Sequence, residues 1–200
     1  MIQILIKGGW MMIPILGCSL LALTITIERG LKFRSLRFSR LADRIIKLAG
    51  QGKWSDALAV AEQRQSPTLR VLAAGIFHRA KQPDKAMEAA GIAEVSQLKR
   101  GLSILDTVIT LGPLLGLLGT IIGMISSFGI MAETGLGNPH AVTGGVAEAL
   151  ICTAAGICVA VITLIPYNYF LSQVEQETER IEQYATQLQT TLQESTAPDS

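Results

Sequence analysis

The sequence predicts an all-α integral membrane protein with three transmembrane helices and long helices that extend into the cytoplasm. Only 16% of the 200 residues are charged, and the apolar residues gather into three blocks that carry no charge at all. These blocks are residues 8–27, 107–132 and 149–174, with 20, 26 and 26 residues. Each reaches the roughly 20 residues that a helix needs to cross about 30 Å of hydrocarbon. A soluble fold has no need of helices that are apolar all round for so long.

The distribution of positive charge predicts the orientation. Fifteen of the seventeen Lys and Arg residues lie between positions 28 and 101, whereas residues 133–147 contain none. Because positive charge near short loops marks the cytoplasmic side, the N-terminus and the second loop are expected in the periplasm, and the large domain and the C-terminus in the cytoplasm. Basic residues can also bind nucleic acid, but these lack interleaved aromatic residues and lie beside a membrane span. We therefore expect a lipid bilayer and no nucleic acid as the surroundings.

The chain divides into six segments along this topology. In order they are an N-terminal segment with the first transmembrane helix (1–28), a cytoplasmic helical domain (29–101), the second transmembrane helix (102–132), a short periplasmic loop with the start of the third helix (133–147), the third transmembrane helix (148–174) and a cytoplasmic helical tail (175–200).

Glycine and proline residues separate the predicted helices of the cytoplasmic domain. Helices are predicted over 39–49, 54–65 and 68–79, and a further helix from Asp84 is expected to run without a break into the second span. In the tail, apolar or small residues alternate at spacings of four and three, as in a coiled-coil seam. The members of this seam are Val174, Thr178, Ile181, Ala185, Leu188 and Leu192.

Glu148 stands directly before the third uncharged block. Asn138 and Pro139 resemble a helix start, because Asn is a good N-cap and Pro suits the first helical position. A helix from Pro139 places Glu148 about 13 Å along its axis, well inside a bilayer. An acid at such a depth costs about 2.5–3.5 kcal/mol on insertion scales, and the spans contain no Lys or Arg to pair with it. We expect a role in proton or ion handling; a bond that fixes neighbouring helices is the alternative.

Small and hydroxyl residues recur along the second and third spans. Such stripes permit close helix contact in lipid, and this role is expected for the glycines Gly112, Gly116, Gly119, Gly123 and Gly156. Thr120 and Thr153 share these stripes. Their hydroxyls can line a hydrated path near Glu148 or bond their own backbone one turn earlier, and the spacing leaves both roles open.

Other chemistry finds little support in the sequence. Cys18, Cys152 and Cys158 lie within spans and match no metal or redox spacing, so they are interpreted as packing residues. The residues before Cys18 loosely resemble a lipoprotein processing site, but the apolar run continues beyond it and favours a retained span. Asp106 is expected at the inner mouth of the second span. His78 and His140 lack companions for a metal site. No nucleophile–base set appears, so neither an enzyme nor a cofactor is predicted.

Two segments together resemble the MotA/TolQ/ExbB proton channel family. They are residues 112–120 with Gly123, and the run GVAEALICTAAG at 145–156. The ExbB and TolQ branches are the most similar, and three spans argue against the flagellar stator branch, whose members carry four. The resemblance implies Glu148, Thr120 and Thr153 as the proton-pathway residues.

The resemblance also implies partners and a place in the cell. Family members form a ring, usually described as a pentamer, around the membrane helices of a single-span partner such as ExbD or TolR, whose helix supplies an aspartate. Protons cross the bacterial inner membrane and the energy passes to a TonB- or TolA-like protein for an envelope process such as outer-membrane uptake. One charge crossing the membrane yields about 2.3 kcal/mol per 100 mV, enough for a modest conformational step. A non-conducting scaffold in which Glu148 only fixes assembly is the alternative.

Overall fold

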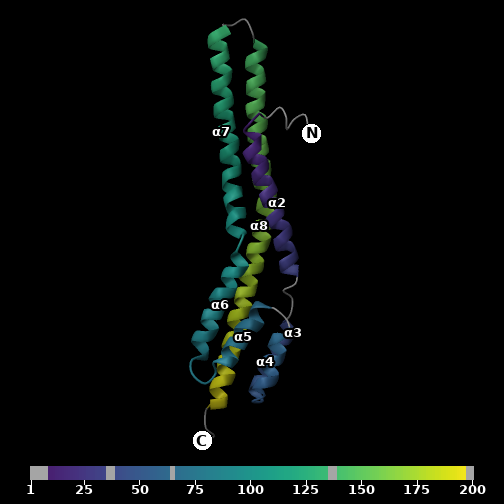
Figure 1. The fold of residues 1–200 in the computed structure, drawn as a ribbon, viewed down its shortest axis with the longest axis vertical. Coiled ribbons are helices and arrows are strands. Elements are labelled where there is room, and N and C mark those ends of the chain that lie inside the picture. Colours follow the sequence, from purple (N-terminus) through teal and green to yellow (C-terminus); the bar gives the residue numbers. More distant parts are fainter. Residues whose placement is uncertain (1–8, 35–38, 64–65, 135–138, 197–200) are drawn as a thin grey trace. The chain divides into compact units, whose positions relative to one another are not determined.

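All regular structure in the described part of the chain is α-helical. The computed structural model describes residues 9–34, 39–63, 66–134 and 139–196 (Figure 1). The helices are α2 (Met12–Arg34), α3 (Ser39–Gly50), α4 (Trp54–Glu62), α5 (Pro67–Phe77), α6 (Pro83–Lys99), α7 (Leu102–Thr134) and α8 (Pro139–Thr196). Three helices, α2, α7 and α8, contain stretches that are long and apolar enough to cross a membrane. The predicted fold class is confirmed.

The chain forms two compact units, and each combines segments that are distant in sequence. The first unit consists of residues 1–29 and 101–169, and it contains most of α2, all of α7 and the first part of α8. The second consists of residues 30–100 and 170–200, and it contains α3 to α6 and the end of α8. We call them the membrane unit and the inner unit.

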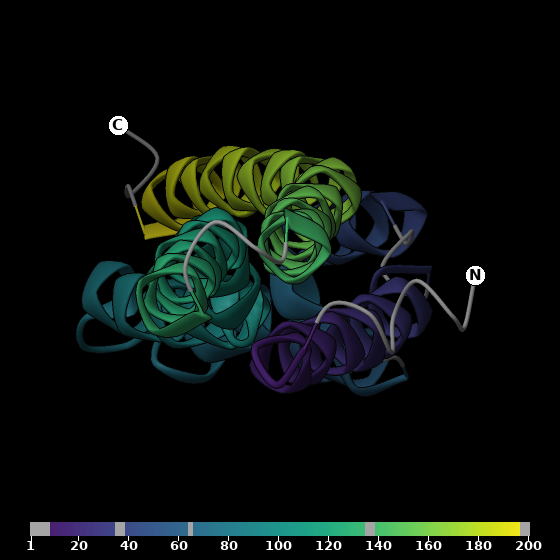
Figure 2. The ribbon, with the colours of Figure 1, turned by 90° about the horizontal axis from the view of Figure 1, so that it is seen from above.

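The beginning of α2 packs against α7 and α8 within the membrane unit. Met11, Met12 and Ile15 form a buried cluster with Cys152 of α8, and Leu115 of α7 packs against it. Figure 2 shows these three helices grouped when viewed from above. Pro14 falls in the first turn of α2, where a missing backbone N–H costs no helical hydrogen bond. The helix therefore continues through Cys18, as expected of a retained span.

The expectation of one unbroken helix from Asp84 into the second span is wrong. Helix α6 ends at Lys99, and α7 begins at Leu102. Between them Arg100 has ψ 130° and Gly101 has φ +86°, a left-handed conformation that glycine adopts at little cost. The apolar residues keep their helical spacing across this point, so the pattern does not indicate the break. The only local sign of the break in the sequence is Gly101.

The tail seam packs on the inner unit's own helices. Val174, Ile181, Leu188 and Leu192 are buried, whereas Thr178 and Ala185 are half-buried. Apart from Val174, the buried seam residues join Tyr184 in one apolar core with α3 to α6. Other members of this core are Ala42, Ile45, Ala49, Ala57, Val60, Ala61, Leu69, Val71, Leu72, Ile76 and Met87. Within this chain, the seam therefore joins the tail of α8 to the inner unit.

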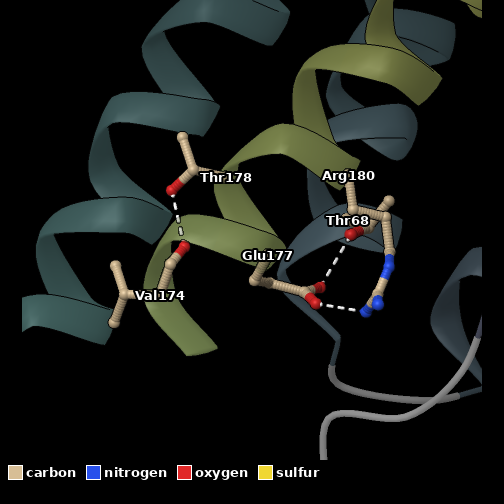
Figure 3. Close-up of polar contacts among 5 residues, drawn as sticks. All are labelled: Thr68, Val174, Glu177, Thr178 and Arg180. Atoms are coloured by element: carbon tan, nitrogen blue, oxygen red, sulfur yellow. Dashed lines mark hydrogen bonds and ion pairs between the residues drawn. The ribbon is translucent and has the colours of Figure 1, made fainter. Parts of the chain in front are cut away.

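A buried acid ties α8 to the start of α5 in the same unit. Glu177 is only 4% exposed, and its Oε1 accepts a hydrogen bond of 2.9 Å from the Thr68 hydroxyl. Its Oε2 accepts a bond of 2.6 Å from Arg180 Nη1 (Figure 3). Thr68 is the second residue of α5, so the carboxylate lies near the positive end of that helix. Glu177 lies three residues after Val174 and four before Ile181, so it falls on the buried face of α8, where the predicted seam had placed Thr178 instead.

Replacing Glu177 by Ala should destabilise the inner unit. The change leaves the buried Thr68 hydroxyl without its acceptor and removes the partner of Arg180, which costs about 1–3 kcal/mol. Thermal unfolding of the detergent-solubilised protein measures the loss as a lower Tm. Glu175→Ala is the matched control, because Glu175 is exposed on the same helix and should leave Tm unchanged. Equal Tm values for the two variants would contradict a stabilising role for Glu177.

Candidate ion-pathway site

Glu148 lies well inside the apolar part of α8. The helix begins at Pro139, as expected, whereas the predicted cap Asn138 lies outside the described residues. At about 1.5 Å per residue, Glu148 is about 13 Å from the helix start. The 26 residues that follow carry no charge.

The side chain of Glu148 borders a small cavity in the membrane unit. The cavity measures about 120 Å³, and since water occupies about 30 Å³ per molecule, it has room for a few waters. Helix α7 and the residues before α2 supply most of its wall. The lining residues are Trp10, Met11, Gly119, Ile122, Gly123, Ser126, Glu148 and Cys152. An acid and a hydroxyl therefore share a small space with apolar walls.

Gly9 makes room for the Glu148 carboxylate. A Cβ placed on Gly9 would lie 1.7 Å from Glu148 Oε1, so only a glycine fits there with this rotamer. Gly9 also has φ +68°, which favours glycine independently. The N-terminal wall of the site consists of Gly9, Trp10 and Met11, which the sequence analysis did not identify. No local pattern could have found them, because they meet Glu148 only through folding across about 140 residues of chain.

Glu148 is nevertheless exposed on the single chain. The side chains near it that line the cavity supply no positive charge. A carboxylate exposed to acyl chains would be costly, so in a membrane this side chain needs water or another protein group around it.

The two threonines have different hydrogen-bond partners. The Thr153 hydroxyl donates to Gly116 O of α7 at 2.8 Å, which links the two helices. The Thr120 hydroxyl donates to Leu117 O of its own helix at 2.6 Å. Each oxygen retains the capacity to accept a bond from water. Neither threonine lines the cavity beside Glu148.

Helix geometry separates Thr153 from Glu148. The two residues are five positions apart, which at about 100° per residue places their side chains about 140° apart around the axis of α8. Along the axis the separation is about 7.5 Å. A direct hydrogen bond between them is excluded, and any proton transfer from one to the other would need water or a group of another chain.

Glycine brings the backbones of α7 and α8 together along this whole stretch. A Cβ on Gly112 would lie 2.8 Å from Gly156 O, and one on Gly116 would lie 2.9 Å from Thr153 Cα. Further along, a Cβ on Gly119 would lie 2.4 Å from Cys152 Sγ. The partner numbers fall on α8 as they rise on α7, so the helices are antiparallel. Gly123 continues the series, since its added Cβ would lie 2.7 Å from Ala149 Cβ.

The remaining polar candidates form no second site. Asp106 is exposed in the second turn of α7, and the ring of His78 lies 3.0 Å from Ala74 O through Nδ1. Cys152 is buried in the α2 contact, consistent with packing, whereas Cys18 is half-buried and Cys158 is exposed. Among the described residues, no group of three or more His, Cys, Asp or Glu side chains could hold a metal ion. The side chain of His140 lies outside the described part.

Comparison with known proteins decides the family. The sequence model of the MotA/TolQ/ExbB proton channel family matches residues 63–183, which is more than half of the chain. The chain belongs to this family. The matched segment includes Glu148, Thr120 and Thr153, together with all five glycines of the α7–α8 contact.

Individual members of the family are similar over most of the chain. The biopolymer transport protein exbB1 of Vibrio cholerae is 33% identical over 76% of this chain and 71% of its own. An ExbB-like protein of Synechocystis, ExbB-like 3, is 37% identical over 82% of both chains. The Tol-Pal system protein TolQ of Pseudomonas aeruginosa is 35% identical over 54% of this chain and 47% of its own. As a family member with three membrane-length helices, the chain is a membrane protein of the ExbB/TolQ type.

Proposed function

We propose that this protein is the proton-conducting subunit of an inner-membrane motor driven by the proton-motive force. Several copies form a ring, a pentamer by family resemblance, around a single-span partner of the ExbD/TolR type. Protons pass through Glu148, with Thr120 and Thr153 further along the path. The energy reaches an envelope process such as outer-membrane uptake through a TonB- or TolA-like protein. The N-terminus lies in the periplasm and the C-terminus in the cytoplasm.

The position of Glu148 carries this proposal. It is the only charged residue of α8 from Pro139 to Val174, and it borders a small cavity that Ser126 also lines. A group that binds and releases a proton inside the membrane field can convert its passage into about 2.3 kcal/mol of work per 100 mV. Membership of a proton channel family supports this role over a purely structural one.

The surroundings of Glu148 support a partner. Glu148 is exposed on one chain. The three membrane-length blocks contain no Asp or Glu that could serve with it as a proton relay. A neighbouring copy together with a partner helix that carries an aspartate would supply both the missing cover and the second proton-binding group. The orientation follows from the positive charge between residues 28 and 101.

A non-conducting scaffold is the competing function. The tight α7–α8 contact, with Thr153 bonded to Gly116 O, would serve a scaffold equally well. In the described part of the chain Glu148 borders a cavity and makes no hydrogen bond to another helix, which supports conduction over a bond that fixes helices of the same chain.

Proton flux in proteoliposomes distinguishes the two functions. The chain is co-expressed with a single-span protein of the ExbD/TolR type from the same genome, purified as a complex and reconstituted with a pH-sensitive dye inside the vesicles. A potassium diffusion potential should then drive protons into the vesicles and change the internal pH. Addition of a proton uncoupler should complete this pH change. Vesicles that contain the chain without its partner should show a slower pH change. A complex of defined mass with no flux above that of empty liposomes would support the scaffold.

A further inference from the structure

The inner unit contains a large groove that the proposed proton path does not use. It lies between α6 and the end of α8 and has a volume of about 700 Å³. Apolar side chains form its floor, among them Met87, Val95, Ile181 and Ala185. Ile92 also lines it and is 66% exposed. Apolar surface gathered in a groove of this size is typical of a site that binds a ligand or another protein.

The rim of the groove is mainly acidic. Asp84 and Glu88 come from the first half of α6, and Glu182 comes from α8. All three are exposed. Lys99 is the basic lining residue, and it lies at the opposite end of α6. The groove therefore suits an apolar group flanked by positive charge, inserted near the beginning of α6.

The same unit presents a group of this kind. Among the described residues from 39 to 100, the large apolar side chains that are exposed are Phe77 and Ile92. Phe77 is 70% exposed at the end of α5, and the turn that follows it carries the exposed residues Arg79 and Lys81. We call Phe77 with Lys81 the knob. Arg79 is already engaged, since its guanidinium carbon lies 5.4 Å from the centre of the Trp54 ring.

We propose that the knob of one copy inserts into the acidic end of the groove of the next copy. Phe77 covers Ile92, and Lys81 faces Glu88 and Glu182. The surfaces are different, so the contact is head-to-tail, and repetition by rotation closes a ring.

The positions of knob and groove within the inner unit suit such a ring. The knob immediately precedes α6, and the acidic end of the groove is formed by the first half of α6. The two therefore lie at the same end of this unit. If neighbouring copies are related by a rotation about an axis parallel to α6, the knob of one copy meets the groove of the next without a shift along that axis. A contact that needed a shift would produce an open filament instead.

This inference rests on the ring of the proposed function and adds the contact that assembles its inner part. It is tested with the full chain and its single-span partner, in membranes that contain two differently tagged forms of the chain. A photo-reactive p-benzoylphenylalanine replaces Phe77, because its benzophenone preserves the aromatic knob. Irradiation should yield a product that carries both tags, with the new bond mapped to α6 or the end of α8.

Charge exchange identifies the pairing. Lys81→Glu places an acid against the acidic rim and should reduce the doubly tagged product about tenfold, because like charges at an interface repel. Adding Glu88→Lys to the same chain should restore it. Lys47→Glu is the matched control, since Lys47 is an exposed basic residue of α3 that does not line the groove, and it should leave the yield unchanged.

Three results would overturn the proposal. They are a cross-link to lipid or another protein in place of this chain, a doubly tagged product that maps outside the groove, and a yield insensitive to Lys81→Glu. The mass of the purified complex separates this failure from failure of the proposed function. A multimeric complex without the cross-link excludes only the knob-and-groove contact, whereas a monomeric chain excludes the ring itself.

Discussion

Replacing Glu148 by Gln is expected to abolish proton-driven function while the protein still accumulates and assembles. Gln has nearly the same shape as a protonated Glu, so the cavity and the contact with Gly9 should persist. It cannot release a proton, however, and the flux through reconstituted complexes should fall by about 100-fold or more, the usual scale for loss of a proton-transfer group. The same variant should abolish energy-dependent envelope function in cells that depend on this protein.

Two further variants define what Glu148 contributes. Glu148→Asp keeps the carboxylate but withdraws it by one methylene, so partial flux is expected. Glu175→Gln removes an exposed acid beyond the uncharged block and should leave flux unchanged. If Glu148→Gln retained normal flux in a correctly assembled complex, the proton would have to pass elsewhere, and the scaffold would be the better account of this residue.

Replacing Gly156 by Ala should have the largest effect on the stability of the membrane unit. The added Cβ would lie 2.3 Å from Gly112 O and 3.1 Å from Gly116 Cα. These are backbone atoms, which cannot rotate away as the end of a side chain can. The two helices must therefore move apart, which also strains the bond from Thr153 to Gly116 O, and a loss of about 1–3 kcal/mol is expected. The measurement is the Tm of the purified protein in detergent.

Gly129→Ala provides the matched control on α7. A Cβ at Gly129 meets no atom within 4 Å, so this change should be neutral or stabilising by up to about 1 kcal/mol through helix propensity. If Gly156→Ala lowers the Tm and Gly129→Ala does not, the loss of stability comes from the contact between α7 and α8. The same Tm for both variants would show that α7 and α8 do not approach so closely in the folded protein.

The main features of the fold could be predicted because they are recorded in local patterns. Long uncharged blocks define the three spans, and the start of α8 at Pro139 follows from a local helix signal. The α7–α8 contact is similar, since glycines at regular spacing permit close packing wherever two apolar helices meet. Such features depend on a residue and its near neighbours, and these are what a sequence displays.

The remaining features depend on contacts between distant segments. Gly9 and Trp10 form a wall of the Glu148 site only because the start of α2 packs on α8. The spacing of Glu177 from Val174 and Ile181 places it on the buried face of α8, but its partner Thr68 comes from α5, which no local pattern of the tail indicates. The break at Gly101 was missed for another reason, since one backbone angle ended a helix whose apolar pattern continues beyond it.

The central claim is that the carboxyl group of Glu148 gains and loses a proton during turnover, and infrared difference spectroscopy observes this event directly. The complex with its single-span partner is labelled with ¹³C-carboxyl Glu, and spectra are recorded with and without an imposed proton gradient. The account predicts a protonated-carboxyl band that changes with the gradient and is absent from Glu148→Gln. A difference spectrum that is identical in the wild type and in Glu148→Gln would contradict it.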